Sequence, residues 1–115
     1  MGYRLEIYKG IFTGFTGGKL YGYIDDEEIK DLKSYQYLVN IGKVDEEFDK
    51  QWGYGFNRKI LLNKDEFREF IELYKEDLNE YGGENTKECF NKQYNSKGFQ
   101  EFLDEINDKI ISWEG

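Results

Sequence analysis

The side chains of this sequence that could do chemistry are carboxylates, arranged in two rows along predicted helices. In the first helix, predicted over residues 63–81, the carboxylates recur every three or four positions on the side opposite the apolar residues. They are Asp65, Glu69, Glu72, Glu76 and Glu80. In the second helix, predicted over residues 96–115, the outward row is Glu101, Asp104, Glu105 and Asp108. Carboxylates one helical turn apart could bind a basic groove of another protein in place of phosphates, although a solvated helix surface can also have this pattern.

The first acidic row carries an energetic cost that favours a functional interpretation. Glu72, Glu76 and Glu80 repel one another at i, i+4 spacing by a few tenths of a kcal/mol per pair. Cations lie along one edge of the row, at Lys64, Arg68 and Lys75, and do not alternate with it. Since a helix selected for stability alone would be expected to alternate the two signs, the row indicates a basic partner.

Other kinds of chemistry have little support in the sequence. The chain has no histidine, which excludes Ser–His and Cys–His nucleophile pairs. Cys89 is the single cysteine, so no internal disulfide can form, and zinc needs clustered Cys and His ligands. We therefore expect a protein that is not an enzyme and that has no catalytic residues, no metal site and no cofactor.

An aromatic stretch supports a second hypothesis. Trp52, Tyr54 and Phe56 are separated by glycines and could present their rings to a small ligand such as a signalling nucleotide. The same rings could instead fill the core of an irregular strand. A protein of this net charge would need a local basic pocket to hold a nucleotide.

Length and charge limit the remaining possibilities. The 115 residues fit one domain, spanning 1–115. The net charge of −8 disfavours direct binding to nucleic acid or to an anionic membrane, because both need a basic face. No signal peptide and no apolar run of about 20 residues is evident. We expect a cytoplasmic protein of unknown oligomeric state whose partner is a basic surface of a host protein that binds nucleic acid.

The expected fold class is α+β, with a small antiparallel sheet of three or four strands packed against the two long C-terminal amphipathic helices. Residues 3–12 and 19–24 alternate as a hairpin around a glycine-rich turn at 13–18. A short helix is expected to follow, through Lys33. Residues 35–41 fit a third strand, although a longer helix fits them too, and residues 59–62 fit a short strand.

Boundary signals are clearest around the first long helix. Asn63 and Glu66 have the spacing of a capping box, and Gly82-Gly83 marks the helix end. Residues 45–50 are expected to form a loop or a single helical turn. Residues 84–95 are expected to form a loop or a short helix.

The chain resembles the small acidic proteins of phages and prophages of low-GC Gram-positive bacteria. The resemblance lies in its length, in its bias toward Tyr, Lys, Asn and Glu, and in the segment KDEFREFIELY over residues 64–74. Some proteins of this kind, including anti-CRISPR proteins, use carboxylate-rich faces as DNA mimics. The resemblance implies an anti-defence inhibitor that acts through protein–protein interaction. An accessory phage protein whose acidity is incidental is the remaining alternative.

Overall fold

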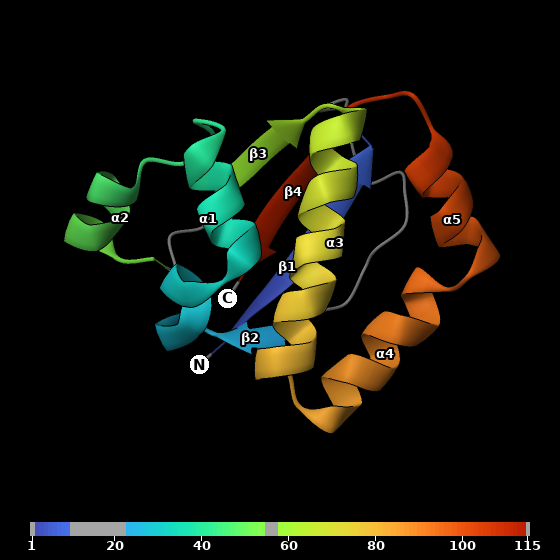
Figure 1. The fold of residues 1–115 in the computed structure, drawn as a ribbon, viewed down its shortest axis with the longest axis horizontal. Helices are drawn as coiled ribbons and strands as arrows, with labels where there is room; N and C mark the ends of the chain where they lie inside the picture. The colour runs from blue at the N-terminus through green and yellow to red at the C-terminus, as the bar shows by residue number, and fades with distance from the viewer. Residues whose placement is uncertain (1, 10–22, 55–57, 115) are drawn as a thin grey trace.

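The computed structural model describes residues 2–9, 23–54 and 58–114 of the chain (Figure 1). Its four-stranded antiparallel sheet has the order β2-β1-β4-β3. The strands are β1 (Gly2–Lys9), β2 (Tyr23–Asp25), β3 (Arg58–Leu62) and β4 (Lys109–Glu114). Ile111 of β4 is paired with Ile7 on one side and with Ile60 on the other, so the C-terminal strand lies inside the sheet.

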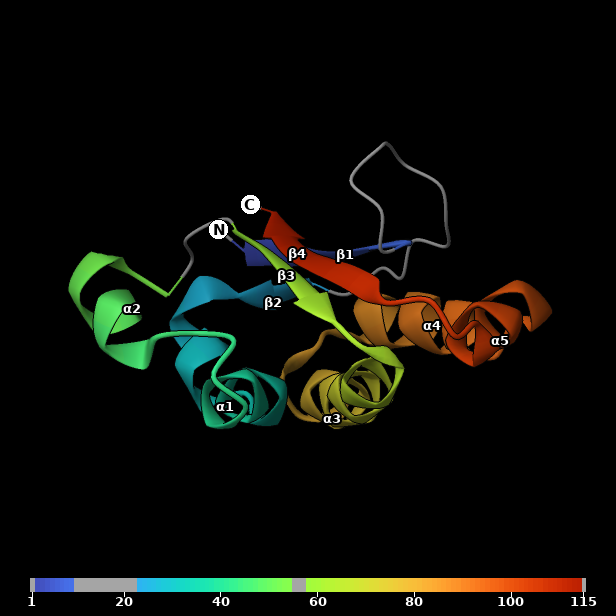
Figure 2. The ribbon, with the colours of Figure 1, turned by 90° about the horizontal axis from the view of Figure 1, so that it is seen from above.

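The helices lie below and beside this sheet. They are the 3-10 helix η1 (Asp26–Asp31) and the α-helices α1 (Lys33–Asn40), α2 (Glu46–Trp52), α3 (Lys64–Tyr81), α4 (Glu84–Tyr94) and α5 (Lys97–Asp104). Figure 2 shows α1 and α3 side by side under one face of the sheet. It places α2 at one end of the molecule and α4 and α5 at the other.

The core forms between the sheet and α3. On β1, Leu5 and Ile7 alternate with residues of the opposite face and are buried in the core. The apolar stripe of α3 is fully covered; it comprises Phe67, Phe70, Ile71, Tyr74 and Leu78. Phe67 meets Phe102 of α5 edge to face, with ring centroids 6.0 Å apart. Aromatic rings therefore supply much of the buried surface, as their number in the sequence leads one to expect.

The structure confirms the α+β class and the signals around α3. Asn63 Oδ1 accepts a hydrogen bond from the backbone N–H of Glu66 at 2.9 Å, and the Glu66 carboxylate accepts one from the backbone N–H of Asn63 at 2.9 Å. This is the predicted capping box. The helix ends at Gly82, where a side chain would meet the carbonyl oxygen of Leu78 at 2.6 Å. β1 and β2 pair antiparallel, as the predicted hairpin requires. The rest of the two predicted strands, residues 10–12 and 19–22, and the glycine-rich turn between them lie outside the described residues.

The prediction of one helix over residues 96–115 is wrong beyond Asp104. Ser96 caps the helix as expected, by accepting a hydrogen bond from the N–H of Phe99 at 3.2 Å. However, α5 ends at Asp104, Glu105 takes extended angles, and residues 109–114 form β4. Hydrogen bonds to β1 on one side and β3 on the other make this segment a strand. The helical spacing of its apolar residues could not show this pairing. Ile106, expected on the inward face, is 84% exposed.

Three other segments settle as helices. Residues 35–41 lie mainly in α1, with Tyr35 and Leu38 buried one helical turn apart, so the expected strand is wrong. The segment is helical, but the alternative of one longer helix is not found either, because Leu32 takes extended angles and separates η1 from α1. Residues 45–50 begin α2, which Asp45 caps by accepting from the N–H groups of Glu47 and Phe48. Residues 84–95 contain α4, the helical alternative for that segment. The short helix expected before Lys33 has 3-10 geometry.

Candidate acidic interface

Helix α3 holds the first row of carboxylates on its outer face. Asp65, Glu69, Glu72, Glu76 and Glu80 are all exposed. They extend along about 22 Å of helix, given a rise of 1.5 Å per residue. Within the described part of the chain, Asp65, Glu69 and Glu80 have no hydrogen bond and no ion pair. These three carboxylates are thus available to a partner.

The other two members of this row have partners inside the molecule. Glu76 lies 3.8 Å from Lys33 Nζ of α1, in a pair whose side chains are both more than half exposed. The hydroxyl of Tyr94 on α4 donates a hydrogen bond to Glu72. Burial, followed by this bond to a carboxylate, raises the pKa of Tyr94 to about 12. The repulsion expected along the row is therefore relieved at Glu72 and Glu76.

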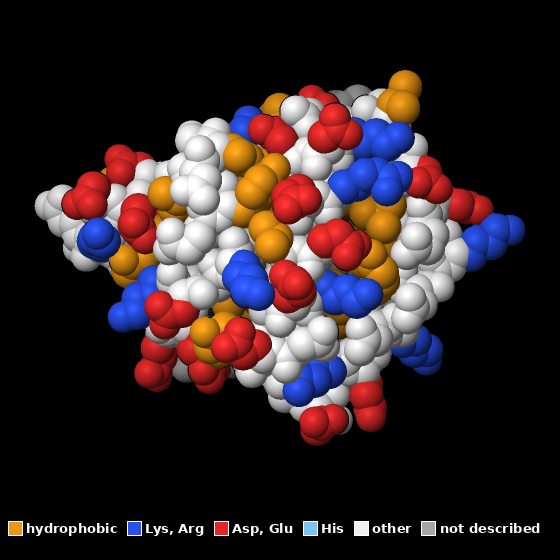
Figure 3. Space-filling model, viewed as in Figure 1, with side chains coloured by type: hydrophobic (Ala, Val, Ile, Leu, Met, Phe, Trp, Pro, Cys, Tyr) orange, Lys and Arg blue, Asp and Glu red, His pale blue; other side chains and the backbone are white. Residues whose placement is uncertain are grey.

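The second row does not continue the first, because cations lie between them. Asp104 pairs with Arg68 at 2.5 Å, and Lys64 Nζ donates to the Asp104 carbonyl at 3.2 Å. Lys75 Nζ lies 4.5 Å from the ring centroid of Tyr94. The basic edge of α3 thus faces α4 and α5 and holds them, and Figure 3 shows Lys and Arg interleaved with Asp and Glu over this part of the surface.

The remaining members of the second row are separated from one another. Glu101 is exposed on α5 and lies 4.0 Å from Lys97. Asp108 is exposed and precedes β4, outside any helix. Glu105, expected to face outward, is half-buried 4.0 Å from Lys109. The nine carboxylates of the two predicted rows are therefore not brought together on one surface.

The structure instead adds carboxylates to the C-terminal end of α3. Burial raises the pKa of Tyr81, and the charges of Glu80, Asp31 and Glu28 raise it further, so η1 and the end of α3 share one acidic region. Burial and then the charges of Asp25, Glu27 and Asp31 raise the pKa of Glu28 itself. In the sequence these η1 residues look only like the start of a helix, because no local pattern shows that they lie near the end of α3.

A similar arrangement surrounds Tyr37 at the other end of α3. Burial raises the pKa of Tyr37, and the charges of Glu66, Glu69 and Asp65 raise it further. We call Asp65, Glu69, Glu80, Glu27, Glu28 and Asp31 the acidic face. In the view of Figure 3 this side of the molecule also shows apolar surface between α1 and α3. The face therefore combines negative charge with aromatic and aliphatic area.

Asp49 and Asp77 are two of the buried carboxylates, and the sequence did not single out either of them. Asp49 is fully buried; it accepts a hydrogen bond from the Tyr35 hydroxyl and pairs with Arg58 at 2.5 Å. Asp77 accepts bonds from the backbone N–H groups of Lys33 and Ser34. The spacing of Asp77, three residues after Tyr74 on the apolar stripe, was the signal that could have identified it. Both acids make hydrogen bonds that join separate elements of the fold.

The aromatic stretch does not form a shared site among the described residues. Trp52 is 66% exposed on α2, with its ring 6.3 Å from that of Phe48. Tyr54 is half-buried and packs edge to face on Tyr35 at 5.5 Å. Phe56 lies outside the described residues. Trp52 and Tyr54 thus belong to different environments.

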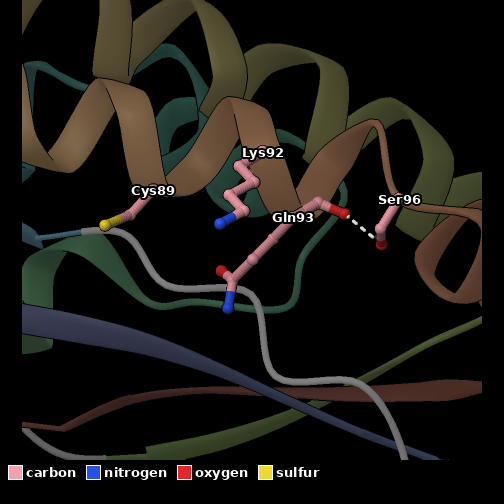
Figure 4. A pocket seen from close by; sticks show the side chains of 4 residues that line it. All are labelled: Cys89, Lys92, Gln93 and Ser96. Carbon is pink, nitrogen blue, oxygen red and sulfur yellow. Dashed lines mark hydrogen bonds between the residues drawn. The ribbon is translucent and has the colours of Figure 1, made fainter.

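A cavity of about 520 Å³ lies beside α4, at the other end of the molecule. Its described lining residues are Cys89, Lys92, Gln93 and Ser96 (Figure 4). The Ser96 hydroxyl donates to the Gln93 carbonyl at 2.6 Å and fixes the turn after the helix. The volume is in the range of small-molecule sites. Among the described residues, no three His, Cys, Asp or Glu side chains are grouped so as to hold a metal ion.

None of the helices in the described ranges combines the length and apolar character that crossing a membrane requires. Comparisons of the chain with known protein families, with curated proteins and with solved structures give no match.

Proposed function

We propose that this protein is a non-enzymatic inhibitor that binds a basic, nucleic-acid-binding surface of a host protein through its acidic face. The observation that carries the proposal is the exposure of Asp65, Glu69 and Glu80 on one helix of a chain with net charge −8. In the described structure no cation pairs with these three carboxylates. Lysine and arginine side chains of a partner could supply the missing charge, and the attraction would speed their encounter.

The spacing of the carboxylates is compatible with partial mimicry of a DNA strand. On the helix axis of α3, Asp65 and Glu69 are about 6 Å apart and Glu69 and Glu80 about 16.5 Å, at a rise of 1.5 Å per residue. The intervening Glu72 and Glu76 already have partners within the molecule. Phosphates of one DNA strand occur about every 3.4 Å. The acidic face is thus a sparser array than DNA, and the apolar area between α1 and α3 adds contacts that DNA lacks. Competition with nucleic acid for a shared groove is the mode of inhibition that follows.

An anti-defence role in a bacterial host is the biological setting that we propose. It is supported by the resemblance to small acidic phage and prophage proteins in length and composition. Anti-CRISPR proteins that occupy basic grooves would be functional analogues. The basic partner would then be a nucleic-acid-binding component of a bacterial defence system.

The experiment is affinity purification from a bacterial lysate, followed by a competition assay between this protein and the partner's DNA or RNA. Two triple variants separate the acidic face from net charge. The first is Asp65→Lys, Glu69→Lys and Glu80→Lys. The matched control is Glu84→Lys, Glu88→Lys and Glu101→Lys on α4 and α5. Each variant replaces one acid in the first turn of a helix, Asp65 in the first and Glu84 in the control, so the effect on helix stability is similar. Each variant raises the net charge from −8 to −2, because every acid-to-lysine change adds two units.

We expect the first variant to lose competition with nucleic acid and the control to retain most of it. Equal loss in both variants would show that net charge alone matters and that the acidic face has no special role. Full retention in both would contradict the proposal and leave the acidity as an incidental property of an accessory protein.

The cavity beside α4 supports a second candidate function, the binding of a small ligand such as a signalling nucleotide. Lys92 supplies a positive charge at its described edge. A bound ligand would raise the melting temperature by mass action. A thermal-shift screen of cyclic and linear nucleotides, repeated on Lys92→Glu, tests this. A shift that the variant abolishes would support the ligand hypothesis, and no shift at millimolar concentration would remove it.

A further inference from the structure

The short helix α2 carries an exposed aromatic pair at the end of the molecule opposite α4 and α5 (Figures 1 and 2). Phe48 is 43% exposed and Trp52 66% exposed. They are one helical turn apart, and their ring centroids lie 6.3 Å from each other. Exposed large apolar side chains that are adjacent, rather than scattered singly, indicate an interaction site.

Helix α2 contacts the rest of the protein through polar groups, and these lie on a different side of the helix from the aromatic pair. Asp49 is fully buried, accepts a hydrogen bond from the Tyr35 hydroxyl of α1, and pairs with Arg58 of β3. Asp45 caps the first turn. These contacts fix α2 through a carboxylate and a cap, so much of the aromatic pair is left facing outward.

The charges around the pair show what it could bind. Asp45 and Glu47 are exposed in this part of the chain, whereas Glu46 is half-buried and accepts a hydrogen bond from Gln36 Nε2 of α1 at 3.1 Å. The nearby cation, Lys50, lies 3.3 Å from Glu47, which offsets only one of these charges. The environment is thus net negative. It would repel the same surface of a second copy of this chain and attract a cationic segment.

We propose that Phe48 and Trp52 dock a basic segment of a partner protein that also carries apolar side chains. Its apolar groups would cover the two rings, and a lysine or arginine would lie over the exposed Trp52 ring, attracted by the exposed carboxylates of Asp45 and Glu47. Tryptophan and arginine are the residues most enriched at the centres of protein interfaces. This site is separate from the α3 carboxylates of the acidic face, since α1 lies between α2 and α3 (Figure 1), and it does not depend on the function proposed above.

The test is selection of a displayed library of random 12-residue peptides on the whole protein. Affinities of the enriched peptides are then measured for the wild type and two double variants. The first variant is Phe48→Ser with Trp52→Ser. The matched control is Leu61→Ser with Ile106→Ser, which removes two other exposed apolar side chains, 40% and 84% exposed. Thermal melts of both variants check that the fold is retained.

We expect the enriched peptides to combine Lys or Arg with apolar residues. The α2 variant should weaken their binding roughly 30-fold or more, as truncation of interface hot spots does, while the control changes it less than about threefold. Glu47→Lys should also weaken binding. The proposal would be overturned by an absence of enriched peptides, by peptides without basic residues, or by peptides that bind the α2 variant normally. The proposal would also be overturned if sedimentation showed that the wild type is a dimer and the α2 variant a monomer. The aromatic pair would then bind a second copy of this chain.

Discussion

The carboxylate of Asp77 on α3 accepts two hydrogen bonds from Ser34 of α1, one from its backbone N–H at 3.0 Å and one from its hydroxyl at 2.6 Å. A third bond comes from the backbone N–H of Lys33 at 2.8 Å. Leu32, at the N-cap position of α1, offers no capping side chain. An acid 43 residues further along the chain thus caps this helix and ties α1 to α3.

Removing this carboxylate should destabilise the protein strongly. Asp77→Ala leaves two backbone N–H groups and a hydroxyl at a buried site without their acceptor, which we expect to cost about 2–4 kcal/mol of unfolding free energy. Asp77→Asn keeps one acceptor oxygen and should cost less. Urea denaturation measures both variants. Asp65→Ala on the outer face of α3 is the control and should change stability by less than about 0.5 kcal/mol; equal effects at the two positions would contradict the capping role.

A second prediction contrasts a buried and an exposed apolar residue. Phe70 is fully buried in the core, and Phe70→Ala should cost about 3–5 kcal/mol and largely unfold the protein. Ile106 follows the same helical spacing in the sequence but is exposed between α5 and β4, so Ile106→Ala should change the melting temperature little. Thermal melts followed by circular dichroism measure both. A large loss at Ile106 would show that the segment packs as a helix after all.

Ile106 also illustrates what the sequence could and could not predict. Local signals were reliable: the Asn63–Glu66 capping box, the glycines after α3 and the apolar stripe of α3 are all found in the structure. The prediction for residues 109–114 was wrong, because Ile110 and Trp113 continue a helical spacing from Phe102 and Ile106 and so favoured a helix. Their true conformation depends on pairing with a strand about 100 residues earlier, which no local pattern contains.

The candidate site shows the same division. The outward position of Asp65, Glu69 and Glu80 followed from helical periodicity and was predictable. The closeness of Glu80 to Asp31 and Glu28 of η1, whose charges act together on Tyr81, depends on tertiary packing and was not. Equally, nothing in composition distinguishes the buried Asp49, which holds Arg58, from its exposed neighbours in α2. Acidic residues with different roles look alike until the fold places them.

The pKa of Tyr94 provides a test of the contact between α4 and α3. Burial and then the hydrogen bond to Glu72 raise this pKa to about 12, from an ordinary value of about 10. Because the fold favours the neutral phenol, the contribution of Tyr94 to stability is complete below about pH 10 and is lost as the pH rises through about 12. The near-ultraviolet absorbance of the wild type and of Tyr94→Phe should be titrated with base. The difference between the two curves should show one phenol that ionises near pH 12. Glu72→Gln should lower its pKa, and a Tyr94 that titrates near 10 in the wild type would show that the contact is absent.

The last prediction concerns how the acidic face meets its partner. Association driven by exposed carboxylates should slow as salt is added, because the screening length falls from about 10 Å at 0.1 M to about 3 Å at 1 M. Dissociation should change less, because it depends on short-range contacts such as the apolar area between α1 and α3. Stopped-flow or surface-binding kinetics with the purified partner separate the two rates. Glu69→Gln with Glu80→Gln should flatten the salt dependence of association, while Glu84→Gln with Glu88→Gln removes the same charge from α4 and should leave most of it. If association is insensitive to salt in the wild type, the carboxylates of α3 do not steer binding and the apolar contacts alone hold the partner.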